Sequence, residues 1–352
     1  MAGVNSGRLK KAPKLKSHGG IVATSQGIDR MSYLPDNILH HILSLLDTKS
    51  LVQTSLLSKR WGRVWKEVPV LNFSNVCFKC SSSFEEHVIK ILSLRSDSAA
   101  VSRVNFKVWS WIDCQYAFSC STDLFDRVMK YAASNGHRGS LRHLSISHSG
   151  NYLVELALAA SIKAHHHHHQ SLKTLNLESF SLELDGGSGS GATLFSGFNQ
   201  LTNLELHNCC MTSSVSSVVE PFVDLPCLKH LRLVDSYVSP PCLLKVSGPG
   251  LLDLQIHSTF VRYHKFEVFA PKLKSLCFRG GLEQLVRLNL PSLDHAKFGV
   301  RIKLQKEIEA IHGACMRLLP QLHNVKSFNL TCFLERSPNT IIKSFEFRRN
   351  ST

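Results

Sequence analysis

The sequence predicts an α/β protein in which a small helical module precedes an irregular solenoid with a curved parallel sheet. Three observations support this class. The 352 residues suffice for about two domains or one long repeat array. A Leu- and Trp-rich block from about Arg30 to Phe73 has helical spacing of its apolar residues. After it, one apolar pattern returns many times.

That pattern is Leu-x-x-Leu-x-Leu. It occurs as "LRHLSI" at 141, "LKTLNL" at 172, "LTNLEL" at 201, "LKHLRL" at 228, "LLDLQI" at 251, "LKSLCF" at 273 and "LDHAKF" at 293. The spacings of 31, 29, 27, 23, 22 and 20 residues lie near the 20 to 29 of leucine-rich repeats. "VKSFNL" at 325 is a further repeat and "VSRVNF" at 101 a degenerate early one. We therefore predict a leucine-rich-repeat solenoid over residues 141–334.

Each repeat is expected to contribute one strand. Successive side chains of a strand alternate between two faces, so Leu204 and Leu206 should point inward and Glu205 toward solvent. Stacked strands would then bury a ladder of leucines and leave the alternate side chains on a concave surface. The ninth position of each repeat varies between Cys209, Phe180, Ser236 and Thr259, so the repeats are irregular.

The Arg30 to Phe73 block predicts three helical segments. Pro35 suits a helix start, and the apolar residues that follow at helical spacing are Ile38, Leu39, Ile42, Leu43 and Leu46. Polar residues from Asp47 to Ser50 indicate a turn before a second short helix. The third segment places on one face Trp61, Val64, Trp65 and Val68.

The stretch "LSKRWGRVW" combines basic and aromatic residues, which also suits nucleic acid. A nucleic-acid surface would need both kinds of side chain on one exposed face. Arg60, Arg63 and Lys66 lie mostly off the tryptophan face, and the block holds only six basic residues against three acidic ones. This favours a protein-partner module and disfavours nucleic-acid binding.

The helical block resembles the F-box in an ordered set of residues: Leu-Pro near its start, paired Ile-Leu residues, "SLLSKRW" and a second Trp four residues after the first. The repeats that follow resemble those of plant F-box/leucine-rich-repeat proteins. The resemblance implies a substrate receptor of a cullin-based ubiquitin ligase, with a Skp-type adaptor linking the F-box to the cullin. The adaptor-facing candidates that it implies are Leu34, Pro35, Ile38, Leu39, Ile42, Val52, Leu57 and Trp61. Alternatively, several of these residues fill the module's core, notably Ile42 and Leu57, together with Trp65. Gly62 departs from many relatives and costs about 1 kcal/mol relative to Ala in a helix.

No catalytic sequence motif is present, so we expect a non-catalytic protein without a cofactor. Two alternatives to the ligase role remain: a scaffold that recruits no cullin, and a nucleic-acid-binding repeat protein. The first is distinguished by cullin recruitment, and the second by steep salt dependence of binding.

The concave positions of the repeats lean positive. They hold Arg142, His143, Lys173, Lys229, His230, Arg232, Lys274, His295 and Lys297, against Glu205, Asp253 and Asp294. A solvated face is one explanation. The other is a substrate site for an acidic or phosphorylated protein segment, formed by Arg142, Lys173, Lys229, Arg232 and Lys274, with Lys229, Arg232 and Lys274 as one cluster.

The net charge of +15 includes five basic residues within positions 1–28, a segment without acidic residues. We expect residues 1–29 to be a disordered basic tail, either a solubilising leader or a nuclear-import signal. No long apolar run indicates secretion or membrane spanning. The expected location is the nucleus, the cytoplasm or both.

Eleven cysteines at irregular spacing indicate free thiols in a reducing compartment. Cys77 and Cys80 form one C-x-x-C, which is weak evidence for a metal site because no second pair follows at zinc-finger spacing. The runs His165–His169 and Asp185–Thr193 are expected to be solvated loops rather than metal or dinucleotide sites.

The expected boundaries are 30–73 for the helical module, 74–140 for a linking region with the degenerate repeat, 141–334 for the repeats and 335–352 for a C-terminal tail. Relatives often continue beyond the repeats, so the end at Thr352 suggests a shortened or alternatively ended form.

Overall fold

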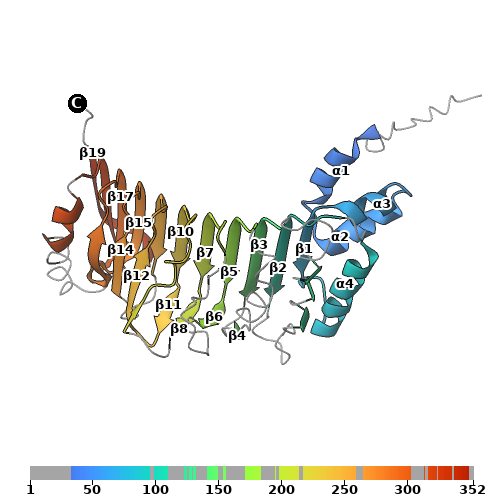
Figure 1. Ribbon diagram of the computed structural model, residues 1–352, viewed down its shortest axis with the longest axis horizontal. Helices are drawn as coiled ribbons and strands as arrows, with labels where there is room; N and C mark the ends of the chain where they lie inside the picture. Colours follow the sequence, from blue (N-terminus) through green and yellow to red (C-terminus); the bar gives the residue numbers. More distant parts are fainter. Residues whose placement is uncertain are drawn as a thin grey trace, which may run out of the picture.

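The computed structural model describes residues 33–95, 99–109, 123–124, 127–128, 130–131, 141–149, 154–155, 171–183, 195, 198–213, 217–258, 265–302, 313, 316–322, 324–334 and 337–348. The basic tail, the histidine run and the Gly-rich segment expected from the sequence lie outside these residues. Figure 1 shows the described chain as a row of strands with most of its helices at the blue, N-terminal end.

The helical end is built from short segments. They are α1 (Asp36–Leu43), α2 (Thr48–Gln53), η2 (Thr54–Leu56), α3 (Trp61–Val64) and η3 (Trp65–Glu67). The shared face predicted for the third segment is confirmed, since Trp61, Val64, Trp65 and Val68 are all buried. They share one core with Leu39, Leu43 and Leu51.

The main sheet has 11 strands in the order β1-β2-β3-β5-β7-β10-β13-β15-β17-β18-β19. Their bounds are β1 (Val70–Ser74), β2 (Arg103–Trp109), β3 (His143–Ser149), β5 (Thr174–Glu178), β7 (Asn203–His207), β10 (His230–Val234), β13 (Asp253–His257), β15 (Ser275–Gly280), β17 (His295–Ile302), β18 (Ser327–Leu334) and β19 (Ser337–Arg348). All neighbours pair in parallel except β18 and β19, which are antiparallel. The predicted curved parallel sheet is thus observed (Figure 1).

The leucine pattern sets the register of this sheet. Leu204 pairs with Leu231 and Leu206 with Leu233, and all four are buried. Toward the C-terminal end phenylalanines continue the ladder, with ring centroids of Phe278 and Phe298 6.4 Å apart and those of Phe298 and Phe328 5.6 Å apart. Each repeat therefore stabilises its neighbour by burying apolar area between them.

Short strands form the second layer of the solenoid. One four-stranded sheet contains β4 (Val154–Glu155), β6 (Phe180–Glu183), β8 (Cys210–Thr212) and β11 (Tyr237–Ser239). The other contains β9 (Val218–Val219), β12 (Leu243–Ser247), β14 (Lys265–Phe269) and β16 (Leu285–Asn289). Two 3₁₀ segments, η4 (Leu282–Gln284) and η5 (Leu319–Leu322), lie near the C-terminal end of the solenoid.

Tight corners join the two layers. Ser179, Asn208 and Asp235 follow β5, β7 and β10 at equivalent positions, and each has a positive φ of 49° to 66°. Asn tolerates this left-handed conformation well. The next residue, at the ninth position, is buried in each case, and Ser236 Oγ there donates to the Leu206 carbonyl at 3.0 Å. Cys209 Sγ likewise donates to the Leu177 carbonyl at 3.5 Å, whereas Phe180 fills the same position with an apolar ring.

The ladder extends beyond the range expected for the repeats. It begins with β1, which the sequence reading assigned to the helical module, and continues with the degenerate repeat as β2. The expected linking region also contains the 14-residue helix α4 (Ser81–Leu94). The segment expected as a C-terminal tail contains β19, because its backbone completes the hydrogen bonding of β18.

One side chain ties the helical end to the ladder. Asn72 on β1 donates from Nδ2 to the carbonyls of Ser44 and Leu46, each at 2.8 Å, just after α1. Its Oδ1 accepts from Asn105 on β2 at 2.6 Å. Because these carbonyls follow the last turn of α1, they lack helical partners and need such donors.

Candidate functional site

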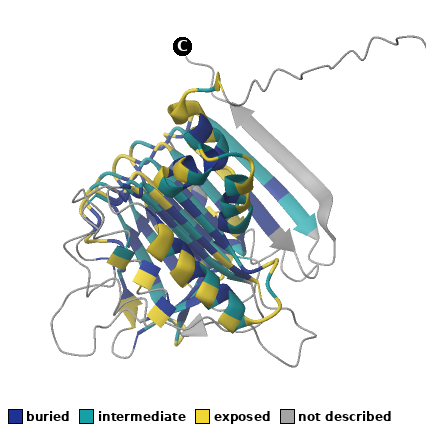
Figure 2. Ribbon diagram, turned by 90° about the vertical axis from the view of Figure 1, so that its right-hand side faces the viewer, coloured by how far each residue is buried: buried dark blue, intermediate teal, exposed yellow. Residues whose placement is uncertain are grey.

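The helical module carries a set of exposed large apolar side chains. Leu56 is 87% exposed, Tyr33 82%, Leu45 75% and Leu57 69%, and Ile38 is exposed as well. Figure 2 views the molecule from the end that carries the helices, whose outer sides include much exposed surface. Grouped exposed apolar residues mark an interaction site, whereas single ones are ordinary. We call these five residues the exposed apolar set.

The structure divides the eight residues expected to face an adaptor. Pro35, Ile38 and Leu57 are exposed, and Leu34, Ile42 and Val52 are partly buried. Leu39 and Trp61 lie in the core with 0% and 5% exposure, which makes their side chains inaccessible to a partner in this structure. The alternative that Leu57 fills the core is wrong, whereas Trp65 is a core residue.

Three members of the exposed apolar set are not among the residues predicted from the sequence to face an adaptor, namely Tyr33, Leu45 and Leu56. Leu45 and Leu56 lie outside the helical stripe used to choose candidates, in the turn after α1 and in η2. The available signal was an excess of apolar residues, since "ILSLL" and "SLL" contain more than one helix face can bury.

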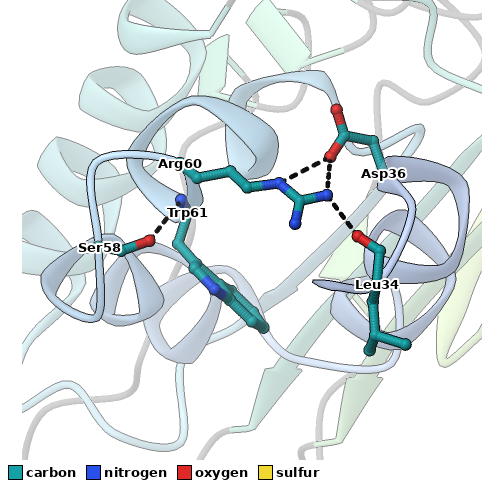
Figure 3. A network of polar contacts seen from close by, with 5 residues as sticks. All are labelled: Leu34, Asp36, Ser58, Arg60 and Trp61. Carbon is teal, nitrogen blue, oxygen red and sulfur yellow. Dashed lines mark hydrogen bonds and ion pairs between the residues drawn. The ribbon is translucent and has the colours of Figure 1, made fainter. Parts of the chain in front are cut away.

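A polar network fixes the entry of the chain into α1 (Figure 3). The Arg60 guanidinium donates to the Leu34 carbonyl, and its Nε donates to Asp36 Oδ1 at 3.1 Å. The hydrogen bond from Arg60 holds the pKa of the Asp36 carboxyl below its usual value. Arg60 is the residue before α3, so these bonds tie α3 to the start of α1 and fix how the exposed side chains of both segments lie.

Asp47 orients α2 between the exposed residues Leu45 and Leu56. Its Oδ1 accepts from the backbone N–H groups of Lys49 and Ser50, each at 3.0 Å, as an N-cap. Burial acts to raise the pKa of Asp47, but the hydrogen bonds from Ser50 and Lys49 outweigh it and lower the pKa. The polar residues read as a turn thus include the cap and first turn of α2.

The open face of the main sheet is polar. Its middle row follows the strand register as Asn72, Asn105, Ser145, Asn176, Glu205, Arg232, Gln255, Cys277, Lys297 and Asn329. These residues alternate along their strands with the buried leucines and phenylalanines. The predicted outward orientation of Glu205 is confirmed by its partial exposure between buried Leu204 and Leu206.

The residues expected to bind substrate fall into separate places. Arg142 and Lys173 lie in neighbouring repeats, where the Lys173 N–H donates to the Arg142 carbonyl at 2.9 Å. Burial, then Arg103, Arg142 and Lys173, lower the pKa of His143. This places three cations near that imidazole, at the rim of the sheet.

The expected cluster of Lys229, Arg232 and Lys274 is not formed. Leu252 stands between Lys229 and Lys274, since its N–H donates to the Lys229 carbonyl and its carbonyl accepts from Lys274. Lys274 pairs instead with Asp294, at 3.3 Å. Lys274 is paired with Asp294 of the next repeat, on the side away from Lys229, so the two lysines do not share one anion site.

Within the described part of the chain, no group of three or more His, Cys, Asp or Glu residues is arranged to hold a metal ion. Cys77 and Cys80 are both exposed free thiols. Hydrogen bonds with Ser82 and Ser83 lower the pKa of Cys80 to about 7. Among the described helices, none combines the length and apolar character needed to cross a membrane.

Comparison with known proteins gives the helical module a counterpart. The F-box domain family matches residues 31–73. One F-box/LRR-repeat protein of Arabidopsis thaliana is 52% identical over 314 residues, which cover 87% of this chain and 60% of the relative. Another is 27% identical over 312 residues, covering 86% of this chain and 60% of the relative.

An F-box/FBD/LRR-repeat protein of the same plant is 30% identical over 281 residues, covering 70% of this chain and 51% of the relative. The chain thus spans between about half and three fifths of the length of these curated relatives. The match to the F-box ends at Phe73, inside β1, where the ladder begins.

Proposed function

Because the chain belongs to the plant F-box/LRR-repeat family, we propose that it is the substrate-recognition subunit of a Skp-cullin-F-box ubiquitin ligase. In this role the F-box binds a Skp-type adaptor, which connects to the cullin, and the solenoid holds a protein substrate for ubiquitination. The chain itself performs no catalysis, since the transfer of ubiquitin belongs to other subunits.

The exposed apolar set is the observation that carries the proposal. The four most exposed large hydrophobic residues of the described chain all lie between Tyr33 and Leu57, within or beside the F-box helices. Covering a Leu side chain contributes about 1.5 to 3 kcal/mol. An adaptor that covers Leu56 and Leu57 together therefore gains enough free energy to bind tightly.

The test replaces Leu56 and Leu57 by Glu in the full chain and measures binding to a purified Skp-type adaptor. Both side chains are exposed, so the variant should fold, and we expect at least a hundredfold loss of affinity from about 3 to 6 kcal/mol of lost burial. The matched control is Val223→Glu, which places the same charge at an exposed apolar position of the solenoid. Equal adaptor binding by the double variant and the control would contradict the proposal.

Recruitment of the cullin separates a ligase subunit from a scaffold. Wild-type chain mixed with adaptor and cullin should form a ternary complex on a sizing column, and the Leu56, Leu57 variant should not. A complex that contains the adaptor but excludes the cullin would favour the scaffold alternative.

We further propose that the protein acts in the nucleus, the cytoplasm or both. The five basic residues within positions 1–28 support an import role. A fluorescent fusion lacking residues 1–28 should shift toward the cytoplasm, and an unchanged distribution would leave the solubilising role.

A further inference from the structure

The C-terminal half of the concave face gathers three cations that the sequence reading did not group. Arg232 on β10, Arg279 on β15 and Lys297 on β17 lie on the open face of the main sheet. Arg232 and Lys297 are in the middle row, with Gln255 and Cys277 between them. Arg279 is two residues further along β15 than Cys277, so it projects on the same side.

The β15–β17 part of the floor between these cations has small residues. Cys277 is the middle-row residue of β15, and Gly299 pairs with Arg279 in the next row. A Cβ atom at Gly299 would lie 2.9 Å from Arg279 Cγ and 3.1 Å from Phe333 Cε2. The absence of a side chain at Gly299 therefore leaves the space that the Arg279 chain occupies.

Among the described residues, none neutralises the three cations through a direct ion pair. Over the described ranges, no carboxylate lies within ion-pair distance of any of them, whereas Lys245 pairs with Glu220 at 2.6 Å and Lys274 with Asp294 at 3.3 Å. The Nε of Arg232 is buried and has no hydrogen-bond acceptor among the described residues. A buried donor without an acceptor is energetically unfavourable, and a bound acceptor would satisfy it.

Arg232 and Lys297 lie three strands apart in the middle row, and Cys277 lies between them under the influence of all three cations. Burial raises the pKa of the Cys277 thiol, while the charges of Arg279, Lys297 and Arg232 act in the opposite direction. Burial, then Arg279 and Arg232, lower the pKa of His257. Cys277 Sγ lies 3.8 Å from His257 Nε2, so both groups occupy the same small region of the sheet.

Three carboxylates restrict what this region accepts, and the first, Glu205, lies beside Arg232 in the strand register. Asp253 acts to raise the pKa of Cys277, and Asp235 acts to raise the pKa of His257, whereas the cations act to lower both. Gln255 Nε2 donates to Asp253 Oδ2 at 3.2 Å and partly satisfies that carboxylate. An extended acidic segment would be repelled by Asp235 and Asp253. A compact dianion placed among three cations is attracted more strongly by them than it is repelled by these carboxylates.

We infer that Arg232, Arg279 and Lys297 form a binding site for a phosphorylated serine or threonine in the protein substrate. This inference rests on the proposed function and specifies the chemistry of the substrate. A phosphate offers three acceptor oxygens and a charge near −2, and the arginine forks match that geometry. Of the five residues predicted from the sequence to bind substrate, only Arg232 belongs to this site, whereas Lys297 was predicted only to lie on the concave face.

The experiment measures binding of the full chain to an oriented peptide library with a fixed phosphoserine or phosphothreonine. Parallel libraries carry unmodified serine or glutamate at the same position. We expect retention of the phosphorylated library alone, and loss of about tenfold or more in affinity for the Arg232→Glu, Arg279→Glu double variant. Failure of the wild-type chain to prefer the phosphorylated library would overturn the inference.

Two control variants separate a specific site from net charge. Lys265→Glu makes a charge reversal at an exposed position of β14, in another sheet, and should change the affinity less than about twofold. Gly299→Ala keeps the charge but displaces Arg279, and should lower the affinity about threefold or more. Equal losses for Lys265→Glu and the double variant, or an unchanged Gly299→Ala affinity, would contradict the assignment.

Adaptor binding is measured on the same samples. A double variant that still binds the adaptor but no longer binds the phosphopeptide supports the site. A wild-type chain that does not bind the adaptor would refute the proposed function and would leave the phosphopeptide result in place. Inorganic phosphate is tested alone, and binding as tight as that of the peptide library would show a free-phosphate site and overturn the peptide assignment.

Discussion

The F-box and the solenoid bury similar side chains but expose different ones. The F-box has a core of Leu and Trp and still presents Leu56 and Leu57 to solvent. The solenoid buries its leucines through strand alternation and presents Asn, Ser, Arg and Lys on its concave face. A module of about 40 residues has too little interior for all its apolar side chains, whereas stacked repeats have a continuous one.

The difference shows how the two regions select partners. Binding to the F-box surface would depend mainly on apolar burial, which changes little with moderate salt. Binding to the Arg232, Arg279 and Lys297 site would depend on charge and should weaken as ionic strength rises. Three further predictions test this contrast, in order of decreasing effect.

The largest expected effect concerns two thiols. Cys80 at the start of α4 is exposed with a pKa of about 7, whereas burial raises the pKa of Cys209 inside the solenoid to about 11. At pH 6 to 7 the thiolate fraction should therefore differ by about 10⁴, and only the thiolate is alkylated. Iodoacetamide labelling followed by peptide mass analysis should modify Cys80 with a midpoint near pH 7.

Cys77 is the control for exposure, since it is also exposed and lies three residues away. The Cys80→Ser variant, which retains Cys77, should lose the fast phase of labelling. Labelling of Cys209 in the folded protein at pH 7, at a rate similar to Cys80, would break the contrast between the two regions.

An intermediate effect is expected where the two regions join. Asn72→Ala removes the donors to the Ser44 and Leu46 carbonyls and leaves Asn105 without its acceptor. The free energy of unfolding should fall by about 1 to 3 kcal/mol. Denaturant unfolding should show the F-box separating from the solenoid as an earlier transition.

The control for this junction is Asn329→Ala, in the same row near the other end of the sheet. It should leave the F-box transition unchanged. If Asn72→Ala and Asn329→Ala give identical unfolding curves, Asn72 does not couple the two regions.

The smallest effect should stay within the F-box. Asp47→Ala removes the N-cap of α2 and should cost about 1 kcal/mol, whereas Asp47→Asn retains an acceptor and should cost less. The folded pKa of Asp47 is lowered, so its contribution is present above its unfolded pKa of about 3.9 and is lost as the pH falls through the folded value.

Thermal unfolding of Asp47→Ala and wild type should therefore differ at pH 7 and converge at low pH. A difference that persists unchanged at pH 2 would show that the cap hydrogen bonds do not carry the effect. Phosphopeptide binding by the solenoid should be unaffected.

The amino-acid sequence by itself determined the architecture. Pro35 and the helical spacing after it predict α1, and the repeated Leu-x-x-Leu-x-Leu predicts parallel strands, because a period fixes which residues share a face. The family resemblance has the same origin, since the F-box match rests on an ordered set of residues from 31 to 73.

Tertiary structure decided which side chains are available to a partner. Leu39 and Leu57 are equivalent as letters, yet one is in the core and the other is exposed, because the packing of short helices depends on their crossing geometry. Arg232, Arg279 and Lys297 are 65 residues apart from first to last, and only the strand register brings them to one place. Local spacing specifies faces within a repeat, whereas charge clusters across repeats depend on backbone pairing and on contacts such as Lys274 with Asp294.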